Sequence, residues 1–279
     1  GDGGGLYVDN CEVVNITECR FEGNASGKAG TVDNSERGGH GGGLYFSSCN
    51  PFIDKCSISN NRTENGGVPY GYPGENGGNG GGIFCSSSCL LTVKNTVISH
   101  NQTGNGSTGQ MFVVADTSGG CGGSGAGVYC YNAMIDHCEI YNNQTGRGGN
   151  VINMNGSGYA GQGGDGAGIY CVFAKIGDSI ITQNITGDGG DGTCFTHSAF
   201  YETYGGNGGF GAGIYSTSSS IDNCSILANK TGDGGSATGS GVSYIGQSGD
   251  GGFGGGIYCG SDSVVERSLI GNNLTGHGG

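Results

Sequence analysis

Short runs of alternating apolar and polar residues recur along the chain, and a glycine-dominated stretch follows each run. In residues 213–216 and 221–226, apolar side chains tend to alternate with polar ones. This period of two predicts β-strands of four to six residues. No stretch shows a 3.6-residue period over two turns, and each glycine opposes a helix by about 1 kcal/mol. We therefore expect an all-β chain.

The alternating runs belong to a unit that occurs seven times, beginning near residues 4, 42, 81, 126, 167, 212 and 255. Each unit opens with small residues, an aliphatic residue and usually an aromatic one. A second marker, [Phe/Ile]-x-x-Asn, places its asparagine 15–18 residues after the aliphatic residue. The spacing between the markers is nearly fixed, whereas the glycine-rich remainder varies in length. The fixed half predicts a pair of strands, and the variable half predicts a loop excursion.

One unit is too small to bury its own apolar residues, so neighbouring units must stack in register. The aliphatic residues of the first marker then form one ladder: Leu6, Leu44, Ile83, Val128, Ile169, Ile214 and Ile257. The aromatic residues that follow them should face the opposite side. Glycines before the first strand supply positive φ where the chain must turn tightly. The sequence predicts a right-handed parallel β-helix of seven coils, forming a single domain over residues 1–279.

The two markers resemble the repeats of the polymorphic outer membrane proteins and of related β-helix autotransporter passengers. The resemblance extends over all seven units. It implies a right-handed parallel β-helix, exposure at the cell surface, and an adhesive or structural role. The long glycine-rich excursions of this chain depart from that pattern.

Every marker asparagine is followed by x-Ser or x-Thr and therefore heads an N-glycosylation sequon. These asparagines are Asn24, Asn61, Asn101, Asn143, Asn184, Asn229 and Asn273, and further sequons begin at Asn15, Asn105, Asn155 and Asn223. The middle residue of the seven varies freely, which favours an exposed turn that carries a glycan. The alternative is a buried ladder of asparagines that bond to one another. We expect glycans on at least some of the seven.

The thirteen cysteines are an odd number, so at least one is unpaired. Many recur at equivalent positions of the unit: Cys85, Cys130, Cys171 and Cys259 after the first aromatic residue, and Cys19, Cys56, Cys138 and Cys224 before the second marker. Alternation places them on the aliphatic face, which predicts small buried side chains. Disulfides between coils are the alternative. No Cys-x-x-Cys pair is present, so we predict no metal site.

Acidic residues outnumber basic ones by 23 to 10, which gives a net charge of −13. This charge disfavours nucleic acid and anionic membrane surfaces as partners. No apolar stretch approaches the roughly 20 residues of a membrane-spanning helix. We expect an extracellular or cell-surface protein.

Enzymatic function has little support in the sequence. Gly-His-Gly, around His40 and His277, resembles one motif of the polygalacturonases, but the paired aspartates and the Arg-x-Lys motif of that family are absent. The negative charge also disfavours an anionic substrate. We predict that the protein is not an enzyme, with a polysaccharide-degrading β-helix enzyme as the remote alternative.

Calcium is the one candidate ion. Five aspartates lie in Gly-Asp-Gly contexts: Asp165, Asp188, Asp191, Asp233 and Asp250. Their oxygens suit Ca²⁺, but the calcium-binding nonapeptide repeat is missing, and Asp-Gly is also ordinary turn sequence. We therefore predict no cofactor.

Two functions from different classes fit these observations. One is a structural filament or coat protein, and the other is an adhesin that binds a host surface or a glycan through loops such as 110–114 and 195–204. We favour the first. Neither end of the sequence carries the polar cap that an isolated solenoid needs, so we expect either a segment of a longer chain that continues into further repeats or a subunit that associates end to end into a fibre, and we favour the fibre. Glycans along the sides would leave only axial growth.

Overall fold

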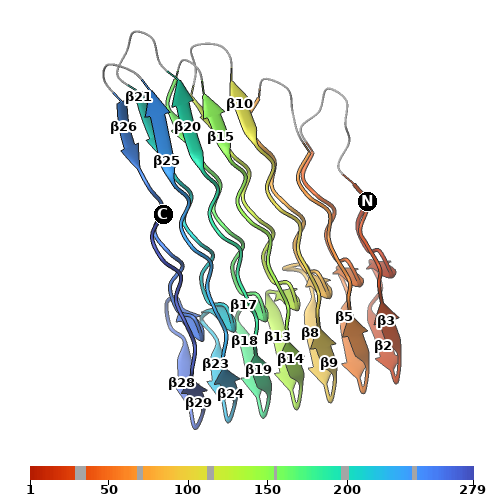
Figure 1. Ribbon diagram of the computed structural model, residues 1–279. Coiled ribbons are helices and arrows are strands. Elements are labelled where there is room, and N and C mark those ends of the chain that lie inside the picture. Colours follow the sequence, from red (N-terminus) through yellow and green to blue (C-terminus); the bar gives the residue numbers. More distant parts are fainter. Residues whose placement is uncertain (29–35, 68–71, 112–115, 154–155, 196–200, 241–243) are drawn as a thin grey trace.

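The computed structural model describes residues 1–28, 36–67, 72–111, 116–153, 156–195, 201–240 and 244–279. Within these residues the regular structure consists of 29 strands, which form three seven-stranded and two four-stranded sheets. Every strand pair is parallel, and the coils lie side by side along one axis (Figure 1). The chain is a parallel β-helix of seven coils, as the sequence predicts.

Each coil contributes one strand to each of three sheets, which we call sheets A, B and C. Sheet A contains β1 (Leu6–Asp9), β4 (Leu44–Ser47), β7 (Ile83–Cys85), β12 (Val128–Cys130), β17 (Ile169–Val172), β22 (Ile214–Thr217) and β27 (Ile257–Cys259). Sheet B contains β2 (Val13–Thr17), β5 (Asn50–Asp54), β8 (Leu90–Lys94), β13 (Asn132–Asp136), β18 (Ala174–Gly177), β23 (Ser220–Asp222) and β28 (Val264–Glu266). Sheet C contains β3 (Arg20–Glu22), β6 (Ser57–Ser59), β9 (Val97–Ser99), β14 (Glu139–Tyr141), β19 (Ile180–Thr182), β24 (Ser225–Leu227) and β29 (Leu269–Gly271).

The register of the sheets confirms the predicted ladders. Ile169 is paired with Ile214 in sheet A, and Ile181 is paired with Ile226 in sheet C. These side chains are fully buried, and they form the core together with sheet B residues such as Ile176. The aromatic residues lie on the outer face of sheet A as a continuous stack with ring centroids 4.7–5.2 Å apart. The stack consists of Tyr7, Tyr45, Phe84, Tyr129, Tyr170, Tyr215 and Tyr258.

The non-glycine half of a coil holds three strands, so the prediction of a pair was wrong. A single residue makes the corner between sheets B and C. His137 makes it in one coil and Asp178 in the next, with φ of 51° and 47°. Because this left-handed conformation is formed without glycine or proline, the sequence carries no conventional turn signal there. The predicted positive-φ glycines do precede sheet A, as at Gly166, where φ is 60°.

In the described residues, the glycine-rich part of a coil is an ordered excursion whose segments bond to those of the neighbouring coils. An outgoing segment leaves sheet C and a returning segment leads back to sheet A. Stacked over the coils, these segments form two layers, which we call the glycine double layer. Gly148 donates to the carbonyl of Asp188 in the next outgoing segment, and Gly163 donates to that of Asn207 in the next returning segment. Gly164 joins the two layers by donating to Gly146.

The backbone direction in these segments repeats every three residues. The N–H groups of Ala160, Gly163 and Gly166 all point to the next coil, and those of Gly161 and Gly164 both point to the outgoing layer. Three residues per turn is the period of polyproline II, whose backbone groups are free to bond to neighbouring chains. One residue in three faces solvent, and there the sequence places side chains.

The close approach of the two layers explains the glycine content. A Cβ on Gly189 would lie 1.8 Å from the carbonyl oxygen of Gly206, and one on Gly148 would lie 1.9 Å from that of Gly161. Arg147 and Asn150, which flank Gly149, are exposed. Glycine therefore occupies nearly all of the inner positions, where the buried Ser107 is an exception, and larger side chains lie at the outer positions.

Beyond the double layer, four of the coils extend into two four-stranded tip sheets (Figure 1). One contains β10 (Gly109–Met111), β15 (Val151–Asn153), β20 (Gly192–Phe195) and β25 (Ala237–Ser240). The other contains β11 (Thr117–Ser118), β16 (Gly158–Tyr159), β21 (Tyr201–Tyr204) and β26 (Tyr244–Gln247). The loops proposed for recognition belong to this tip, although residues 112–115 and 196–200 lie outside the described part of the chain.

Candidate functional site

The marker asparagines form a ladder at the corner where sheet C meets the glycine double layer. Asn61, Asn101, Asn143, Asn184 and Asn229 are at most 1% exposed. Asn24 and Asn273, in the two outermost coils, are half-buried. The structure thus brings all seven predicted residues into one row along the axis.

Each central asparagine is hydrogen-bonded through its whole amide group. Asn184 Nδ2 donates to Oδ1 of Asn229 and to the carbonyl of Ile140, both at 3.0 Å. Its Oδ1 accepts from the backbone N–H and from Nδ2 of Asn143, again at 3.0 Å. These bonds pin each coil to the next, and burial without them would be costly.

The expectation of glycans on some of these asparagines stays a prediction, and the geometry bears against it at the five buried members. A sugar on Nδ2 would replace one of its two donor hydrogens and would need space that the core fills. The buried ladder, which the sequence left open as the alternative, is the arrangement observed. The exposed sequons are Asn15, Asn105 and Asn223, while Asn155 lies outside the described residues.

In six of the seven ladder sequons, the hydroxyl of the Ser or Thr donates to a glycine carbonyl of the returning layer. Thr145 Oγ1 donates to the carbonyl of Gly164 at 2.6 Å and accepts from the N–H of Gly187 at 2.8 Å. The hydroxyl therefore joins the outgoing layer to the returning layer and to the following coil. Asn-x-Thr in this chain is a hydrogen-bonding motif of the corner, whether or not it is also read as a sequon.

The cysteines before the second marker belong to a similar ladder between sheets B and C. Cys138 Sγ donates to the carbonyl of Asp136, and the backbone N–H of Cys138 donates to Ser179 Oγ in the next coil. Ser179 makes the corresponding bond to the carbonyl of Gly177. Cys, Ser and Thr alternate here because each offers one donor and one acceptor. These cysteines are buried, as predicted, apart from Cys19, but they also cap the turn.

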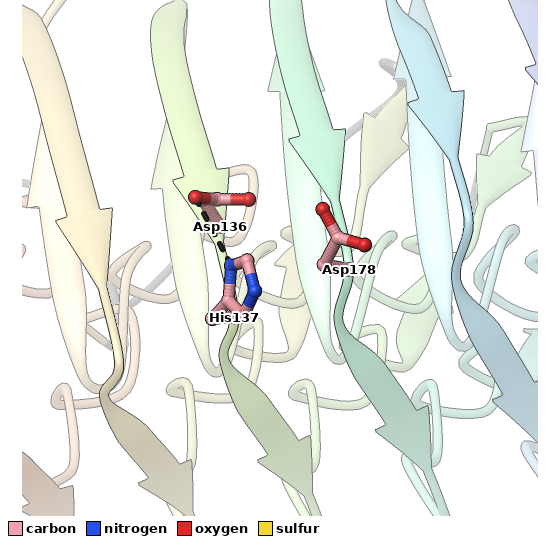
Figure 2. A group of neighbouring side chains, drawn as sticks. All are labelled: Asp136, His137 and Asp178. Atoms are coloured by element: carbon pink, nitrogen blue, oxygen red, sulfur yellow. Dashed lines mark ion pairs between the residues drawn. The ribbon is translucent and has the colours of Figure 1, made fainter.

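A polar cluster lies on the outside of the same corner. His137 Nδ1 is 3.1 Å from Asp136 Oδ2, and Asp178 comes from the next coil at the position that follows His137 along the axis (Figure 2). One ligand atom from each residue lies within 4.8 Å of the other two. We did not predict this group from the sequence because Asp178 lies 41 residues after His137 and 42 residues after Asp136, although Asp136 and His137 are adjacent. Aligning the coils by register is the signal that finds it.

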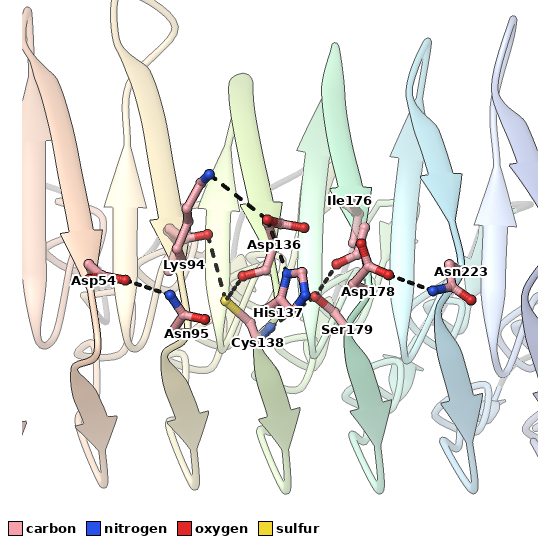
Figure 3. A network of polar contacts seen from close by, with 12 residues as sticks. Asp54, Lys94, Asn95, Asp136, His137, Cys138, Ile176, Asp178, Ser179 and Asn223 are labelled. Atoms are coloured by element: carbon pink, nitrogen blue, oxygen red, sulfur yellow. Dashed lines mark hydrogen bonds and ion pairs between the residues drawn. The ribbon is translucent and has the colours of Figure 1, made fainter.

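Asp136, His137 and Asp178 are the residues that could hold a divalent cation, since carboxylate and imidazole groups are ligands for zinc. Their contacts in the structure instead indicate a role in holding neighbouring coils together. Asp136 Oδ2 also lies 3.9 Å from Lys94 Nζ, and Asp178 Oδ1 accepts from Asn223 Nδ2 (Figure 3). A cation would have to compete with the Lys94 ammonium group for the Asp136 carboxylate. The cluster is part of a row of coil-to-coil polar contacts.

That row continues over the neighbouring coils. Asn95 Nδ2 donates to Asp54 Oδ1 at 2.8 Å (Figure 3). Arg267 donates to Asp222 through two nitrogens, and these hydrogen bonds hold the pKa of the Asp222 carboxyl below its usual value. Each acid is paired with a base or an amide, mostly of the adjacent coil, so the charges along this corner support stacking.

The histidines of the two Gly-His-Gly motifs are not equivalent. His40 is buried, stacks on Phe84 with ring centroids 4.7 Å apart, and accepts from the N–H of Asn79 through Nδ1. Burial, together with the nearby Arg37 charge, lowers the pKa of His40 to about 4. His277 is exposed and bonds through its backbone to Asp233. Neither arrangement places the imidazole beside an acid and an open substrate site in the described structure.

The Gly-Asp-Gly aspartates lie on the glycine double layer and not in turns. Asp188 Oδ1 accepts from the N–H of Asp233, and Asp165 Oδ1 accepts from the N–H of Phe210. Burial raises the pKa of Asp165 to about 6. Within the described residues, none of the five belongs to a group of three ligand atoms close enough to hold an ion. Four of the five accept a hydrogen bond from the next coil, as asparagines at equivalent positions do, and Asp250 donates its backbone N–H to Asn207 Oδ1.

Comparison with family models, curated proteins and solved structures finds no significant match to this chain. The parallel β-helix is therefore assigned from the structure itself. Among the described residues, no helix has the length and apolar character needed to cross a membrane.

Proposed function

We propose that this protein is a non-enzymatic extracellular structural protein, a β-helical filament or surface-coat component. The observation that carries the proposal is the direction in which its polar groups are used. Asn184, Thr145 and Asp188 each bond along the axis to the neighbouring coil. Catalytic side chains converge on one site. The ladder residues of this chain instead repeat from coil to coil and stabilise an extended body.

End-to-end association is the proposed route to a longer fibre. Val265 and Ile270 continue the inner ladders into the last coil, where they are 37% and 49% exposed, whereas Ile221 and Ile226 of the preceding coil are fully buried. A second copy stacked in register would cover both side chains. Such a head-to-tail contact does not close on itself and extends into a filament.

Negative-stain imaging of the purified chain tests this proposal. We expect rods several times longer than one chain, and we expect Ile270→Asp to shorten them to single units because the charge would be buried at the junction. Val264→Asp is the matched control. Val264 lies on the outer face of β28, so this substitution should leave assembly unchanged. Monodisperse single units of the unsubstituted chain at all concentrations would contradict the filament.

Glycosylation is proposed at the exposed sequons in place of the buried ones. Asn105 is exposed on the outgoing layer. Its Oδ1 accepts from the backbone N–H of Arg147, and this bond does not involve Nδ2, the atom that would carry a sugar. Glycopeptide mapping of the secreted chain should find sugar at Asn105 or Asn15 and none at Asn101, Asn143 or Asn184. A glycan on any of these three buried residues would show that the ladder is not as described.

An adhesin, as implied by the resemblance to autotransporter passenger repeats, is the second candidate. It is favoured by a groove of about 280 Å³ on the outgoing layer. The groove is lined by amide and guanidinium groups, which suit sugar hydroxyls: Arg62, Asn65, Gln102, Asn105, Gln144 and Arg147. Retention of the chain on a glycan array that depends on Gln144 would favour the adhesin over the coat protein.

A further inference from the structure

Two buried thiols face one another at the corner between sheets A and B. Cys49 immediately precedes β5 and Cys89 immediately precedes β8, and the pairing of Phe52 with Thr92 places the two cysteines opposite each other. Their sulfur atoms are 3.9 Å apart, and each residue is 3% exposed. Neighbouring strands lie about 4.8 Å apart, which falls within the range of Cα separations that a disulfide spans.

The surroundings of the two sulfurs differ in a way that suits disulfide chemistry. Cys49 lines a surface cavity of about 420 Å³, together with Asn10 and Ser88, so a small oxidant can approach it. Cys89 lies behind it, where Ser86 Oγ is 3.5 Å from its sulfur. A hydrogen bond from the Cys85 thiol holds the pKa of Cys89 below its usual range, whereas burial raises that of Cys49. Cys89 therefore has the greater thiolate character.

A second pair of cysteines provides an internal comparison. Cys130 and Cys171 are also paired in register, but both are completely buried. Their sulfurs donate to the backbone carbonyls of Tyr170 and Tyr215. Burial raises the pKa of both thiols. Both pairs lie in register on neighbouring strands, but only in the first pair does one cysteine, Cys49, line a surface cavity and the other, Cys89, have a lowered pKa.

We propose that Cys49 and Cys89 are an oxidative cross-linking site, at which a low-molecular-weight disulfide such as oxidised glutathione joins the second coil to the third. The Cys49 thiol loses its proton to water, and its sulfur attacks one sulfur of the oxidant, whose S–S bond breaks to release one thiolate; each released thiolate takes up a proton from water. The Cys89 thiolate then attacks the Cys49 sulfur of the mixed disulfide and releases the second thiolate. Two protein thiols are oxidised by two electrons, and one oxidant molecule is reduced to two thiols. The fold and the oxidant suffice for this reaction, so it is independent of the proposed coat or adhesive role.

Peptide mapping after treatment with oxidised glutathione tests the cross-link. Trypsin releases residues 38–55, whose only cysteine is Cys49, and residues 63–94, which contain Cys85 and Cys89. After alkylation in denaturant, without reduction, we expect these two peptides to be joined in the unsubstituted chain and in Cys85→Ser. We expect them to be separate in Cys89→Ser, where Cys49 should instead retain glutathione.

The peptides of Cys130 and Cys171, residues 95–147 and 148–175, serve as the control and should stay separate.

The cross-link closes a loop of 40 residues, so the oxidised chain should also melt at a higher temperature than the reduced chain. Alkylated, unlinked Cys49 and Cys89 under conditions that oxidise the exposed Cys11 would overturn the proposal. A link that persists in Cys89→Ser would also overturn it, because Cys85 would then be the partner.

Discussion

Replacing Gly206 with alanine is expected to destabilise the chain by about 3 kcal/mol or more, at the upper end for overpacking. The new Cβ would lie 1.8 Å from the carbonyl oxygen of Gly161. That oxygen belongs to the backbone of the preceding coil and accepts the interlayer bond from the N–H of Gly190, so it cannot move away without breaking this bond. The interlayer bond from Gly206 to Gly190 would be lost in the process.

Urea unfolding of the variant measures the loss, and hydrogen exchange at the amides of Gly206 and Gly161 locates it. Gly177→Ala is the matched control, because its Cβ would meet only a side-chain oxygen of Asp136, at 3.3 Å, in an otherwise open position. We expect the control to change stability by less than about 1 kcal/mol. Equal effects of the two substitutions would contradict the requirement for glycine in the double layer.

Replacing Asn184 with leucine should cost about 3 kcal/mol, although the side chains have similar volumes. The backbone N–H of Asn143 and one hydrogen of its Nδ2 would lose their acceptor inside the core. The carbonyl of Ile140 and Oδ1 of Asn229 would each lose a donor. A buried polar group without a partner costs about 1–3 kcal/mol, and neighbouring losses are not additive.

Asn24→Leu is the control within the same ladder. Asn24 Nδ2 donates to Asn61 Oδ1, and Asn24 lies in the outermost coil, so fewer groups lose a partner than at Asn184. We expect a loss of about 1 kcal/mol in the same urea experiment. If Asn184→Leu proved as mild as Asn24→Leu, the ladder would not be a main source of stability.

The sequence predicts the ladders of the core because the same kind of residue returns at the same phase of every coil. Ile169 and Ile214 could therefore be paired without a structure. The third strand could not, because a lone left-handed residue such as His137 makes the intervening corner. The double layer does leave a trace in the sequence, since residues 146–150 read Gly-Arg-Gly-Gly-Asn, with a side chain at every third position. The glycine-rich stretches vary in length, which favoured a loop, and this interpretation left the three-residue period unnoticed.

The sequence favours exposure of the asparagines, and the burial of five of them has a local geometric reason. The middle residue of the motif varies freely because it points outward, and Ile185 is 43% exposed. In an extended corner the adjacent residue points the opposite way, so Asn184 is buried. Tolerance at one position therefore carries no information about exposure at its neighbour. The polar cluster of Asp136, His137 and Asp178 was missed because its members come from different coils.

The exchange of Cys138 for Ser179 and Cys224 at one corner position has an evolutionary consequence. All three bond to a carbonyl of their own turn, and Cys138 and Cys224 bond in the same way to a serine hydroxyl of the next coil, so a coil meets equivalent partners wherever it stands in the order. Gene duplication or deletion of one unit would then preserve every contact and alter only the length of the body, in steps of about 4.8 Å. Related chains should differ in coil number before they differ in ladder chemistry.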